Sequence, residues 1–414
     1  MEFGRKILHS DMNCFYASVE MMLNPSLRGR AVAVCGSTED RHGIVLAKSE
    51  KAKRAGVRTG MVNHEARALC PDLIMVEPHY EQYLKYSRLA REIYCDYTDL
   101  VEPFGMDECW LDVTESVNLF GGAEDIAKEI NSRIKSELGI TVSVGVSFNK
   151  IFAKLGSDMK KPDAVTVITP ENFRQKVWHL PAGDLLYAGR ATVRRLTELG
   201  IYTIGDLANT EIRVLKSVFG VNGLKLYRYA NGTDCSRVAH KDFVSPVKSI
   251  GHGITCVADL ENDDEVRRVI LSLSQDIGHK LRVHSLKAEG VQVSVRSRDL
   301  IIRQFQTRMP LASMLPADIA LNAYKLFLMK YNWYVPVRSI TVRAINLVPA
   351  REEVQLDLFN DYARLDRLEK MQLAVEDIRR RFGKGAINPC SLFSELKIAD
   401  KGASEIIMPS IMYG

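Results

Sequence analysis

Two adjacent carboxylates, Asp107 and Glu108, stand between apolar residues in the segment GMDECWLDV (residues 105–113). The apolar neighbours predict the tight end of a buried hairpin, where carboxylates are costly unless they meet a cation. Asp11 follows a short apolar run, so we expect it at the carboxyl end of a strand, where it could join the pair. Three such carboxylates suit Mg²⁺. The alternatives are a solvated turn for the pair and a helix cap for Asp11.

The segments around these acids alternate between strand and helix. Residues 6–10 predict a short strand that leads into a helix over residues 11–20. Residues 123–138 carry isoleucine or leucine at every fourth position from Ile126, as an amphipathic helix does. Residues 141–148 alternate valine with small residues, which is typical of a strand. We therefore expect a palm-like α+β layer, one sheet backed by helices.

Basic residues gather in two segments that could face an anion. Residues 48–58 hold five of them, and residues 149–164 carry Lys150, Lys154, Lys160 and Lys161. Lysines close to clustered carboxylates are expected where a polyphosphate bridges the two. A solvated helical face is the alternative for the first segment.

The second half of the chain carries patterns suited to DNA phosphates. Residues 196–207 predict helix, tight turn and helix, whose backbone N–H groups can hold phosphates, although such a module also serves protein contacts. Residues 235–247 lack periodicity and predict an exposed linker. In residues 291–298 the valines alternate with Gln292, Ser294, Arg296 and Arg298, which predicts a strand with one buried and one cationic face.

The composition is that of an ordinary soluble globular chain. Its 414 residues are 46% hydrophobic and 26% charged, with a formal net charge of +5. No apolar run reaches the ~18 residues needed to span a bilayer, and we find no secretory start. The eight cysteines are scattered without zinc spacing, so they read as reduced thiols of a cytoplasmic protein.

Four segments, in this order, resemble the Y-family translesion DNA polymerases, most closely the bacterial DNA polymerase IV type. They are DMNCFYASVE (11–20), PFGMDECWLDV (103–113), VGVSFNKIFAKLGSDMKKPDA (144–164) and LGIYTIGDL (199–207). The resemblance covers the chain to about residue 360. It implies an α+β multidomain, right-hand polymerase with a palm, small fingers, a helical helix-hairpin-helix thumb and an α/β little finger. The implied boundaries are palm 1–14 and 80–168, fingers 15–79, thumb 169–233, linker 234–246, little finger 247–349 and tail 350–414.

The resemblance also implies roles for individual residues. Asp11, Asp107 and Glu108 would be the catalytic acids and, with the Met12 carbonyl, would bind two Mg²⁺ ions. Without metal, at least one of these acids should titrate above its ordinary value. The expected nucleotide-binding residues are Phe15, Tyr16 as the steric gate against ribose, Lys53 and Lys161. The expected DNA-binding residues are Arg296, Arg298, Arg303 and Arg308.

The tail carries a short apolar peptide. Residues 355–359 read QLDLF and are similar to the bacterial sliding-clamp-binding pentapeptide. Its expected contact residues are Gln355, Leu356, Leu358 and Phe359. Residues 362–382 then predict a helix rich in arginine and glutamate.

The sequence departs from the family pattern in three respects, the third of which involves two residues. Asn13 replaces a second acid, which should be tolerable because Asp11 is the expected ligand. Glu50 stands where a tyrosine commonly donates to the triphosphate, so Glu50 is left out of the site, and either it points away or Ser49 or Lys48 takes over. Ile44 and Leu46 are larger than the usual residues over the templating base, which argues against bypass of bulky lesions.

We interpret the sequence as a template-directed, low-fidelity DNA polymerase that is monomeric, binds primer–template DNA, deoxynucleoside triphosphates and a sliding clamp, and has no membrane partner. A non-catalytic DNA- and clamp-binding adaptor is the first alternative, but it has no need of three carboxylates. A nucleotidyl cyclase is the second, and it leaves the thumb, the basic sheet and the clamp peptide unexplained.

Overall fold

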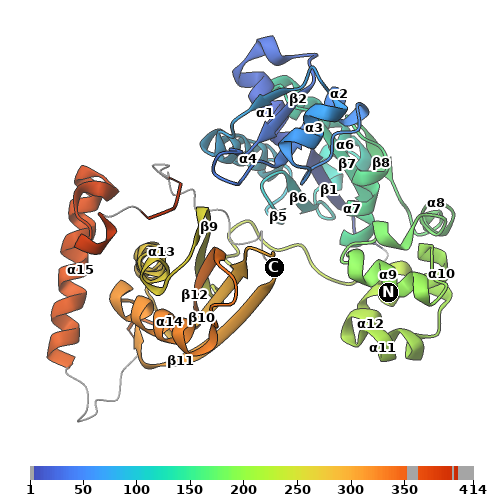
Figure 1. The fold of residues 1–414 in the computed structure, drawn as a ribbon. Coiled ribbons are helices and arrows are strands. Elements are labelled where there is room, and N and C mark those ends of the chain that lie inside the picture. Colours follow the sequence, from blue (N-terminus) through green and yellow to red (C-terminus); the bar gives the residue numbers. More distant parts are fainter. Residues whose placement is uncertain (1–3, 352–361, 394–395, 400–414) are drawn as a thin grey trace. The chain divides into compact units, whose positions relative to one another are not determined.

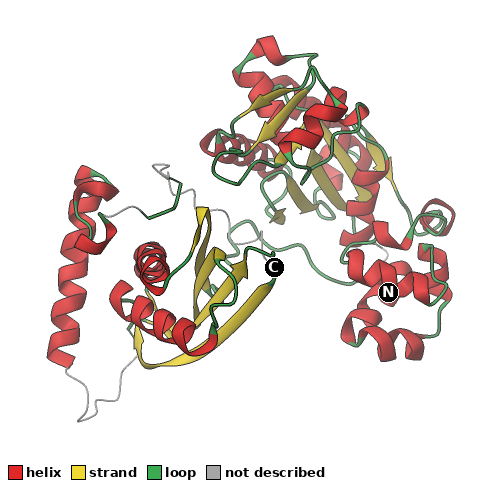
Figure 2. Cartoon of the chain, viewed as in Figure 1, coloured by secondary structure: helices red, strands yellow, loops and turns green. Residues whose placement is uncertain are grey.

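The computed structural model describes residues 4–351, 362–393 and 396–399. The chain forms two compact units: among the described residues, the first comprises 4–36 and 44–245, and the second comprises 37–43, 246–351, 362–393 and 396–399. Both units mix helices and strands (Figures 1 and 2), so the predicted α+β class is confirmed. Among the described residues, no helix is both long enough and apolar enough to cross a membrane.

A five-stranded sheet with the strand order β5-β6-β1-β7-β8 forms the centre of the first unit. The strands and the helices that cover them are β1 (Ile7–Met12), α4 (Tyr80–Cys95), β5 (Val101–Phe104), β6 (Glu108–Asp112), α6 (Ala123–Arg133), β7 (Val142–Ser147), α7 (Lys150–Met159) and β8 (Val165–Val167).

Alternate residues of β1 serve the two faces of this sheet. Leu8 is fully buried in the apolar core that α4 and α6 form with the sheet. His9, the next residue, points to the other face, where its ring contacts Ser157 of α7. The predicted pattern of strand, helix and strand around the acids is therefore confirmed, and every second residue of β1 lies under α7.

A glycine on β7 lets α7 approach the sheet closely. Gly145 pairs with His9 across the β1–β7 ladder. A Cβ at Gly145 would lie only 1.9 Å from the carbonyl oxygen of Ala153, and one at Gly156 would lie 3.2 Å from the Cα of Gly145. Backbone therefore packs on backbone here, which brings the side chains of α7 within reach of β1.

The same unit contains a smaller layer with a three-stranded sheet, order β3-β2-β4, and a helical region. Ala33, Val45, Ala52 and Ala66 lie in the core of the small layer. Its elements are α1 (Phe15–Leu23), η1 (Pro25–Leu27), β2 (Val32–Cys35), β3 (Val45–Lys48), α2 (Glu50–Arg54), α3 (Asn63–Leu69) and β4 (Ile74–Val76).

The remaining helices of the first unit include the predicted helix, tight turn and helix, now seen as α9 and α10. Thr203 caps α10 by accepting a hydrogen bond from the backbone N–H of Asp206, whose carboxylate bonds back to the N–H of Thr203. These helices are α5 (Val117–Phe120), η2 (Ile134–Leu138, a π-helical turn), α8 (Phe173–Val177), η3 (Ala182–Asp184), α9 (Arg190–Glu198), α10 (Ile204–Asn209), α11 (Ile212–Phe219) and α12 (Val221–Ala230).

The segment after α12 lies along the first unit, and the prediction of an exposed linker is wrong for part of it. Val238 is only 4% exposed and packs with Ile7 and Trp110. The N–H of Ala239 donates to Glu102, and Lys241 forms an ion pair of 2.7 Å with Asp99. The sequence gave no periodic signal for this contact, because Val238 is a single apolar residue among polar neighbours.

The second unit is built on a four-stranded sheet with the order β11-β10-β12-β9. The valines of β10 pack against α13 and α14 on one face, as their alternation predicted. Its elements are β9 (Ile250–Leu260), α13 (Asp263–Val283), β10 (Leu286–Ser297), β11 (Ile302–Ser313), α14 (Pro316–Lys330), β12 (Val337–Pro349), α15 (Tyr362–Phe382), η4 (Lys384–Ala386) and η5 (Cys390–Leu392).

Helix α15 has the bounds that the sequence predicted, and it is attached to α13 through charged residues. Glu376 accepts from Arg282 at 2.7 Å and lies 3.0 Å from His279, while Lys287 forms an ion pair of 2.9 Å with Glu369. Polar contacts therefore hold this helix to the second unit.

Candidate active site

The three acids lie at one end of β1 and β6. Asp11 and Glu108 are direct partners in the antiparallel ladder, and Asp107 precedes Glu108 in the turn. The N–H of Met12 donates to the carbonyl oxygen of Asp107 at 2.9 Å, which ties β1 to that turn. The helix-cap alternative for Asp11 is wrong, because Cys14 occupies the N-cap position of α1.

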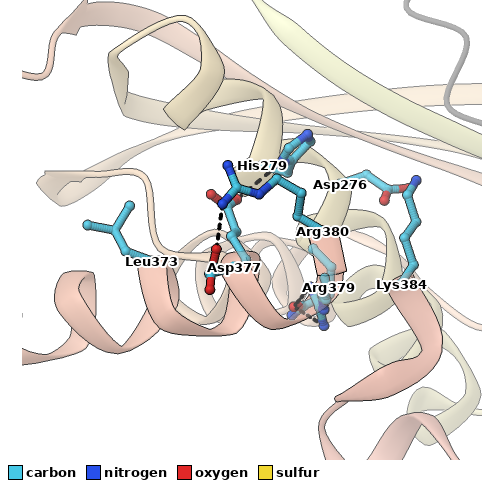
Figure 3. Close-up of a pocket in the computed structure, with 9 residues that line it drawn as sticks. Asp276, His279, Leu373, Asp377, Arg379, Arg380 and Lys384 are labelled. Carbon is cyan, nitrogen blue, oxygen red and sulfur yellow. Dashed lines mark hydrogen bonds and ion pairs between the residues drawn. The ribbon is translucent and has the colours of Figure 1, made fainter. Parts of the chain in front are cut away.

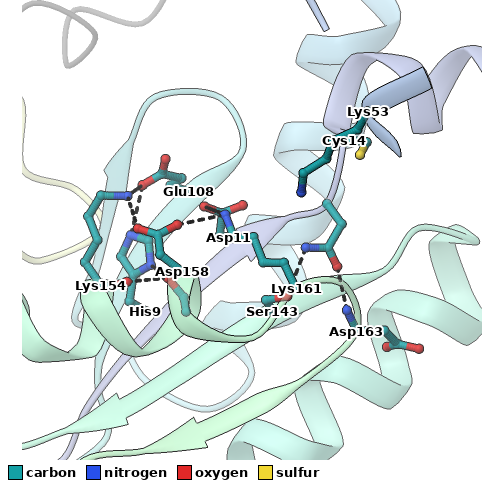
Figure 4. A network of polar contacts seen from close by, with 12 residues as sticks. His9, Asp11, Cys14, Lys53, Glu108, Ser143, Lys154, Asp158, Lys161 and Asp163 are labelled. Atoms are coloured by element: carbon teal, nitrogen blue, oxygen red, sulfur yellow. Dashed lines mark hydrogen bonds and ion pairs between the residues drawn. The ribbon is translucent and has the colours of Figure 1, made fainter. Parts of the chain in front are cut away.

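Each end of the acid group has its own lysine (Figure 4). Lys154 of α7 donates to Oε2 of Glu108, and the same oxygen lies 3.1 Å from Nε2 of His9. Lys161, just beyond α7, donates to Oδ2 of Asp11 at 2.7 Å and pairs with Asp158 at 2.9 Å. The solvated turn is therefore excluded, since Asp11 and Glu108 are held by buried or half-buried partners and Asp107 is itself half-buried.

The predicted oxygen cage is not assembled in the structure. No group of three His, Cys, Asp or Glu side chains in the described part of the chain is arranged to hold a metal ion. The physical reason is that like charges repel, and each cation draws one carboxylate aside: Lys154 draws Glu108 and Lys161 draws Asp11.

The three acids differ in pKa. Burial, followed by the charges of Asp11 and Glu108, raises the pKa of Asp107 to about 7. Burial raises the pKa of Asp11 to about 6 even though Lys161 opposes the shift. Burial acts in the same direction on Glu108, but His9 and then Lys154 lower its pKa to about 2. The prediction that at least one acid titrates above its ordinary value is confirmed, with burial as the larger cause.

These residues fit a divalent cation. Asp11 is 6% exposed, so its raised pKa reflects a carboxylate with little water to stabilise its charge. Carboxylate and carbonyl oxygens are hard ligands of the kind that Mg²⁺ takes, and a bound cation would lower both raised pKa values. The donor set therefore suits Mg²⁺ even though the side chains are held by lysines.

Tyr16 lies next to the acids on the first turn of α1. Its ring stacks on Tyr83 at 4.2 Å between centroids and 8° between planes, and burial followed by the charge of Asp107 raises its pKa. Phe15 is only 3% exposed and packs behind Tyr16 and Tyr83. The stacked pair gives Tyr16 a rigid backing.

The helix α2 presents Lys53 and Glu50 together. Lys53 lies 3.5 Å from Oε1 of Glu50, which also accepts from the Cys14 thiol at 3.3 Å. Ser49 is committed to the fold, since its Oγ accepts from the N–H groups of Val32 and Ala52. Of the two replacements considered for the missing tyrosine, Ser49 is thus excluded, while Lys48 bonds only Thr59 among the described residues.

The predicted DNA-binding arginines fall at different places on the second unit. By strand register Arg296 and Arg308 share the face of the sheet that α13 and α14 leave open. Arg303 pairs with the buried Val295, so it belongs to the opposite face at the edge strand. Arg298 lies beyond the end of β10 and pairs with Asp259 at 2.8 Å. The structure therefore places two of the four on the open face, at register positions six residues apart along β10.

Comparison with known proteins identifies the family. Residues 10–158 match the sequence model of the impB/mucB/samB family, residues 247–358 match that family's C-terminal domain, and residues 185–234 match the thumb domain of DNA polymerase-iota. The chain is 49% identical to a DNA polymerase IV of Acetivibrio thermocellus over 92% of this chain and 95% of that protein. A DNA polymerase IV of Pelotomaculum thermopropionicum is 37% identical over 92% and 94%.

The chain belongs to the Y-family DNA polymerases. Its fold agrees: a solved Y-family DNA polymerase chimera superposes with a TM-score of 0.73 at 25% identity, covering 83% of this chain and 99% of that one. The resemblance seen in the sequence is confirmed at the level of DNA polymerase IV, a translesion DNA-directed DNA polymerase. As such an enzyme the chain binds DNA and deoxynucleoside triphosphates, and polymerases of this type use divalent metal ions.

Sequence reasoning did not assign His9, Lys154 or Arg343 to a site, although it named Lys154 among the lysines that could face a polyphosphate. His9 and Lys154 hold Glu108, and Arg343 of β12 pairs with Gln292 at the centre of the open face. The strand alternation held a signal for two of them. His9 is two residues before Asp11 and so shares its face, and Arg343 alternates with Val342 and Ala344.

A cavity of about 460 Å³ lies in the second unit of the polymerase, between α13 and α15 (Figure 3). Its lining mixes acids and bases, with Asp276 and Asp377 beside Arg379 and Arg380. It shares no residue with the acid group. The predicted clamp-binding residues 355–359 lie outside the described residues.

Proposed function

We propose that this polymerase extends primers with two Mg²⁺ ions held by Asp11, Asp107, Glu108 and the Met12 carbonyl. The ladder pairing of Asp11 with Glu108, with Asp107 in the adjoining turn, is the observation that supports this assignment. When bound, the ions supply the charge that activates the primer 3′-hydroxyl and neutralises the triphosphate. Glu108 would serve the 3′-hydroxyl side.

Lys161 and Lys53 would bind the triphosphate. Lys161 already lies 2.7 Å from Asp11, so a phosphate that approaches Asp11 meets a cation without rearrangement of the backbone. Lys53 carries charge on a half-exposed side chain but, unlike arginine, offers no bidentate fork. Tyr16 would lie under the sugar and exclude a 2′-hydroxyl, with Phe15 supporting it.

The open face of the second unit would follow the DNA backbone. Arg296, Arg308 and Arg343 stand on it among serine, threonine and glutamine, a composition that contacts phosphates without reading bases. The domains would be the palm (1–14 and 80–168), fingers (15–79), thumb (169–233), linker (234–246), little finger (247–349) and tail (350–414). Residues 355–359 would bind a sliding clamp, and the chain would act as a cytoplasmic monomer.

Removal of one acid tests the proposal. Asp107→Ala should abolish primer extension, a loss of at least about 10³-fold, while primer–template binding measured by fluorescence anisotropy stays within about twofold. Glu124→Ala is the matched control, since Glu124 is an exposed acid of the same unit that, within the described part of the chain, pairs with Lys128 alone. Extension by Asp107→Ala at the rate of the control would reject the two-metal site and favour the adaptor.

A further inference from the structure

His9 occupies a buried position between α7 and the acid group. It is 0% exposed, and its ring packs edge-on against Trp110 at 5.2 Å between centroids. Nδ1 lies 2.8 Å from Oγ of Ser157, whose hydroxyl also donates to the carbonyl oxygen of Lys154 at 2.7 Å. The imidazole is therefore held at Nδ1 by Ser157 and at its ring by Trp110.

Its other nitrogen has one polar neighbour. Nε2 lies 3.1 Å from Oε2 of Glu108, at ion-pair distance although off the line of a directed hydrogen bond. No other polar atom of the described residues bonds this buried nitrogen. A buried polar atom without a second partner is costly, so its position next to Glu108 requires a reason.

Both contacts of Glu108 go to the same oxygen. His9 and Lys154 meet Oε2, whereas Oε1 has no bond to the described residues. The carboxylate is thus oriented by two groups that meet one of its oxygens, and its second oxygen is left without a bond to the described residues.

We infer that His9 is a positioning residue for the polymerase reaction: it orients Glu108 through Oε2, so that Oε1 is presented to the metal on the primer-hydroxyl side. Partners of this kind, which hold a metal ligand without touching the metal, contribute about 10- to 100-fold to metal affinity. The inference rests on the proposed two-metal site and adds a residue to it. It depends on placement and requires no change in the charge of His9.

Direct metal binding tests the inference. The full chain, bound to a dideoxy-terminated primer–template, is titrated with Mn²⁺ and followed by electron paramagnetic resonance. His9→Phe keeps a ring against Trp110 but removes both nitrogens. For the tighter Mn²⁺ site, the one to which Glu108 contributes, the Kd should rise about 10-fold. His9→Gln restores an amide near Nε2 and should recover part of the affinity. Ser157→Ala should weaken it in the same direction but less.

Steady-state kinetics supply a second readout. His9→Phe should lower kcat while the KM for the incoming nucleotide stays within about twofold, because only the metal ligand is disturbed. His252→Phe is the matched control, since His252 forms a 2.7 Å pair with Asp276 in the second unit and should change neither quantity. If thermal unfolding shows that His9→Phe is poorly folded, His9→Gln and Ser157→Ala carry the test.

The outcomes separate the inference from the proposed function. Wild-type Mn²⁺ affinity in His9→Phe, together with weakened binding in Asp107→Ala, would overturn the role of His9 and leave the two-metal site intact. Unchanged binding in Asp107→Ala would overturn the two-metal site, and the role of His9 with it.

Discussion

The two large sheets of this polymerase differ in how far their charged side chains are exposed to solvent. The five-stranded sheet is covered on both faces, by α4 and α6 on one and by α7 on the other, and its acids are buried or half-buried with a cation on each side. Among the described residues, α13 and α14 cover one face of the four-stranded sheet, and Arg296, Arg308 and Arg343 are exposed on the other.

The difference shows what each kind of chemistry requires. Buried carboxylates keep a strong field and a fixed geometry for a small cation, at a cost in stability. Exposed arginines lose little solvation and can follow a repeating polyanion, with a weak contribution from each. Substitutions around the five-stranded sheet should therefore have large effects even when few atoms change. Each substitution on the open face of the four-stranded sheet should have a small effect.

The largest effect is expected where α7 meets the covered sheet. Gly145→Ala places a Cβ 1.9 Å from backbone oxygen, so α7 must shift away from β1. We expect about 3 kcal/mol or more of lost stability by urea denaturation, and loss of most activity, because overpacking against backbone has no flexible side chain to yield. Gly4→Ala, with open space around it, is the control and should change neither.

The next largest effect concerns sugar selection. Tyr16→Ala removes the ring that stacks on Tyr83, and we expect ribonucleotide discrimination in single-nucleotide incorporation to fall about 10- to 100-fold. Tyr16→Phe keeps the ring and should retain discrimination. Equal discrimination by Tyr16→Ala and the wild type would show that another residue is the gate.

Because burial of an ionised acid is unfavourable, the free energy of unfolding should depend on pH. Because the pKa of Asp107 rises to about 7 on folding, the folded state holds more protons than the unfolded chain, so this residue's stabilising contribution is lost as pH rises from about 4 to about 7. In EDTA at pH 8, Asp107→Asn should raise the free energy of unfolding by on the order of 2 kcal/mol, and the gain should vanish near pH 4. A gain that instead grows as pH falls would contradict the assigned shift.

The smallest effect is expected on the open sheet. Arg343→Ala should weaken primer–template binding only a few-fold and reduce the salt dependence of binding by about one charge. Arg267→Ala is the control, because Arg267 lies on α13, on the covered side, and pairs with Asp264. If Arg343→Ala reduced primer extension as much as Asp107→Ala does, the contrast drawn between the two sheets would be wrong.

Local sequence patterns predicted much of the fold. Strand alternation predicted β7 and the two faces of β10, and helical periodicity predicted a helix over residues 123–138, which α6 and the π-helical turn η2 form together. The segment rich in arginine and glutamate predicted α15. Asp11, Asp107 and Glu108 were also expected to meet, because each lies at a strand end or turn. These features depend on neighbours in sequence, so they can be read from it.

What could not be predicted depends on contacts between distant segments. Lys154 reaches Glu108 across 46 residues and Ser157 reaches His9 across 148, and both contacts require α7 to lie on the sheet at Gly145. The placement of Arg303 on the covered face depends on the β10–β11 register, which composition does not determine. Periodicity also gave no sign that Val238 is buried on the first unit.

The side-chain amide of Asn13, which departs from the family pattern, hydrogen-bonds two other segments of the first unit. Its amide nitrogen donates to Oγ of Ser143 at 3.0 Å, and its oxygen accepts from the N–H of Asp163 at 2.9 Å. An ionised carboxylate could only accept at this position. The amide thus cross-links the end of β1 to the loop that carries Lys161, so the backbone between the acids and the lysine that we propose to bind phosphate is held in place.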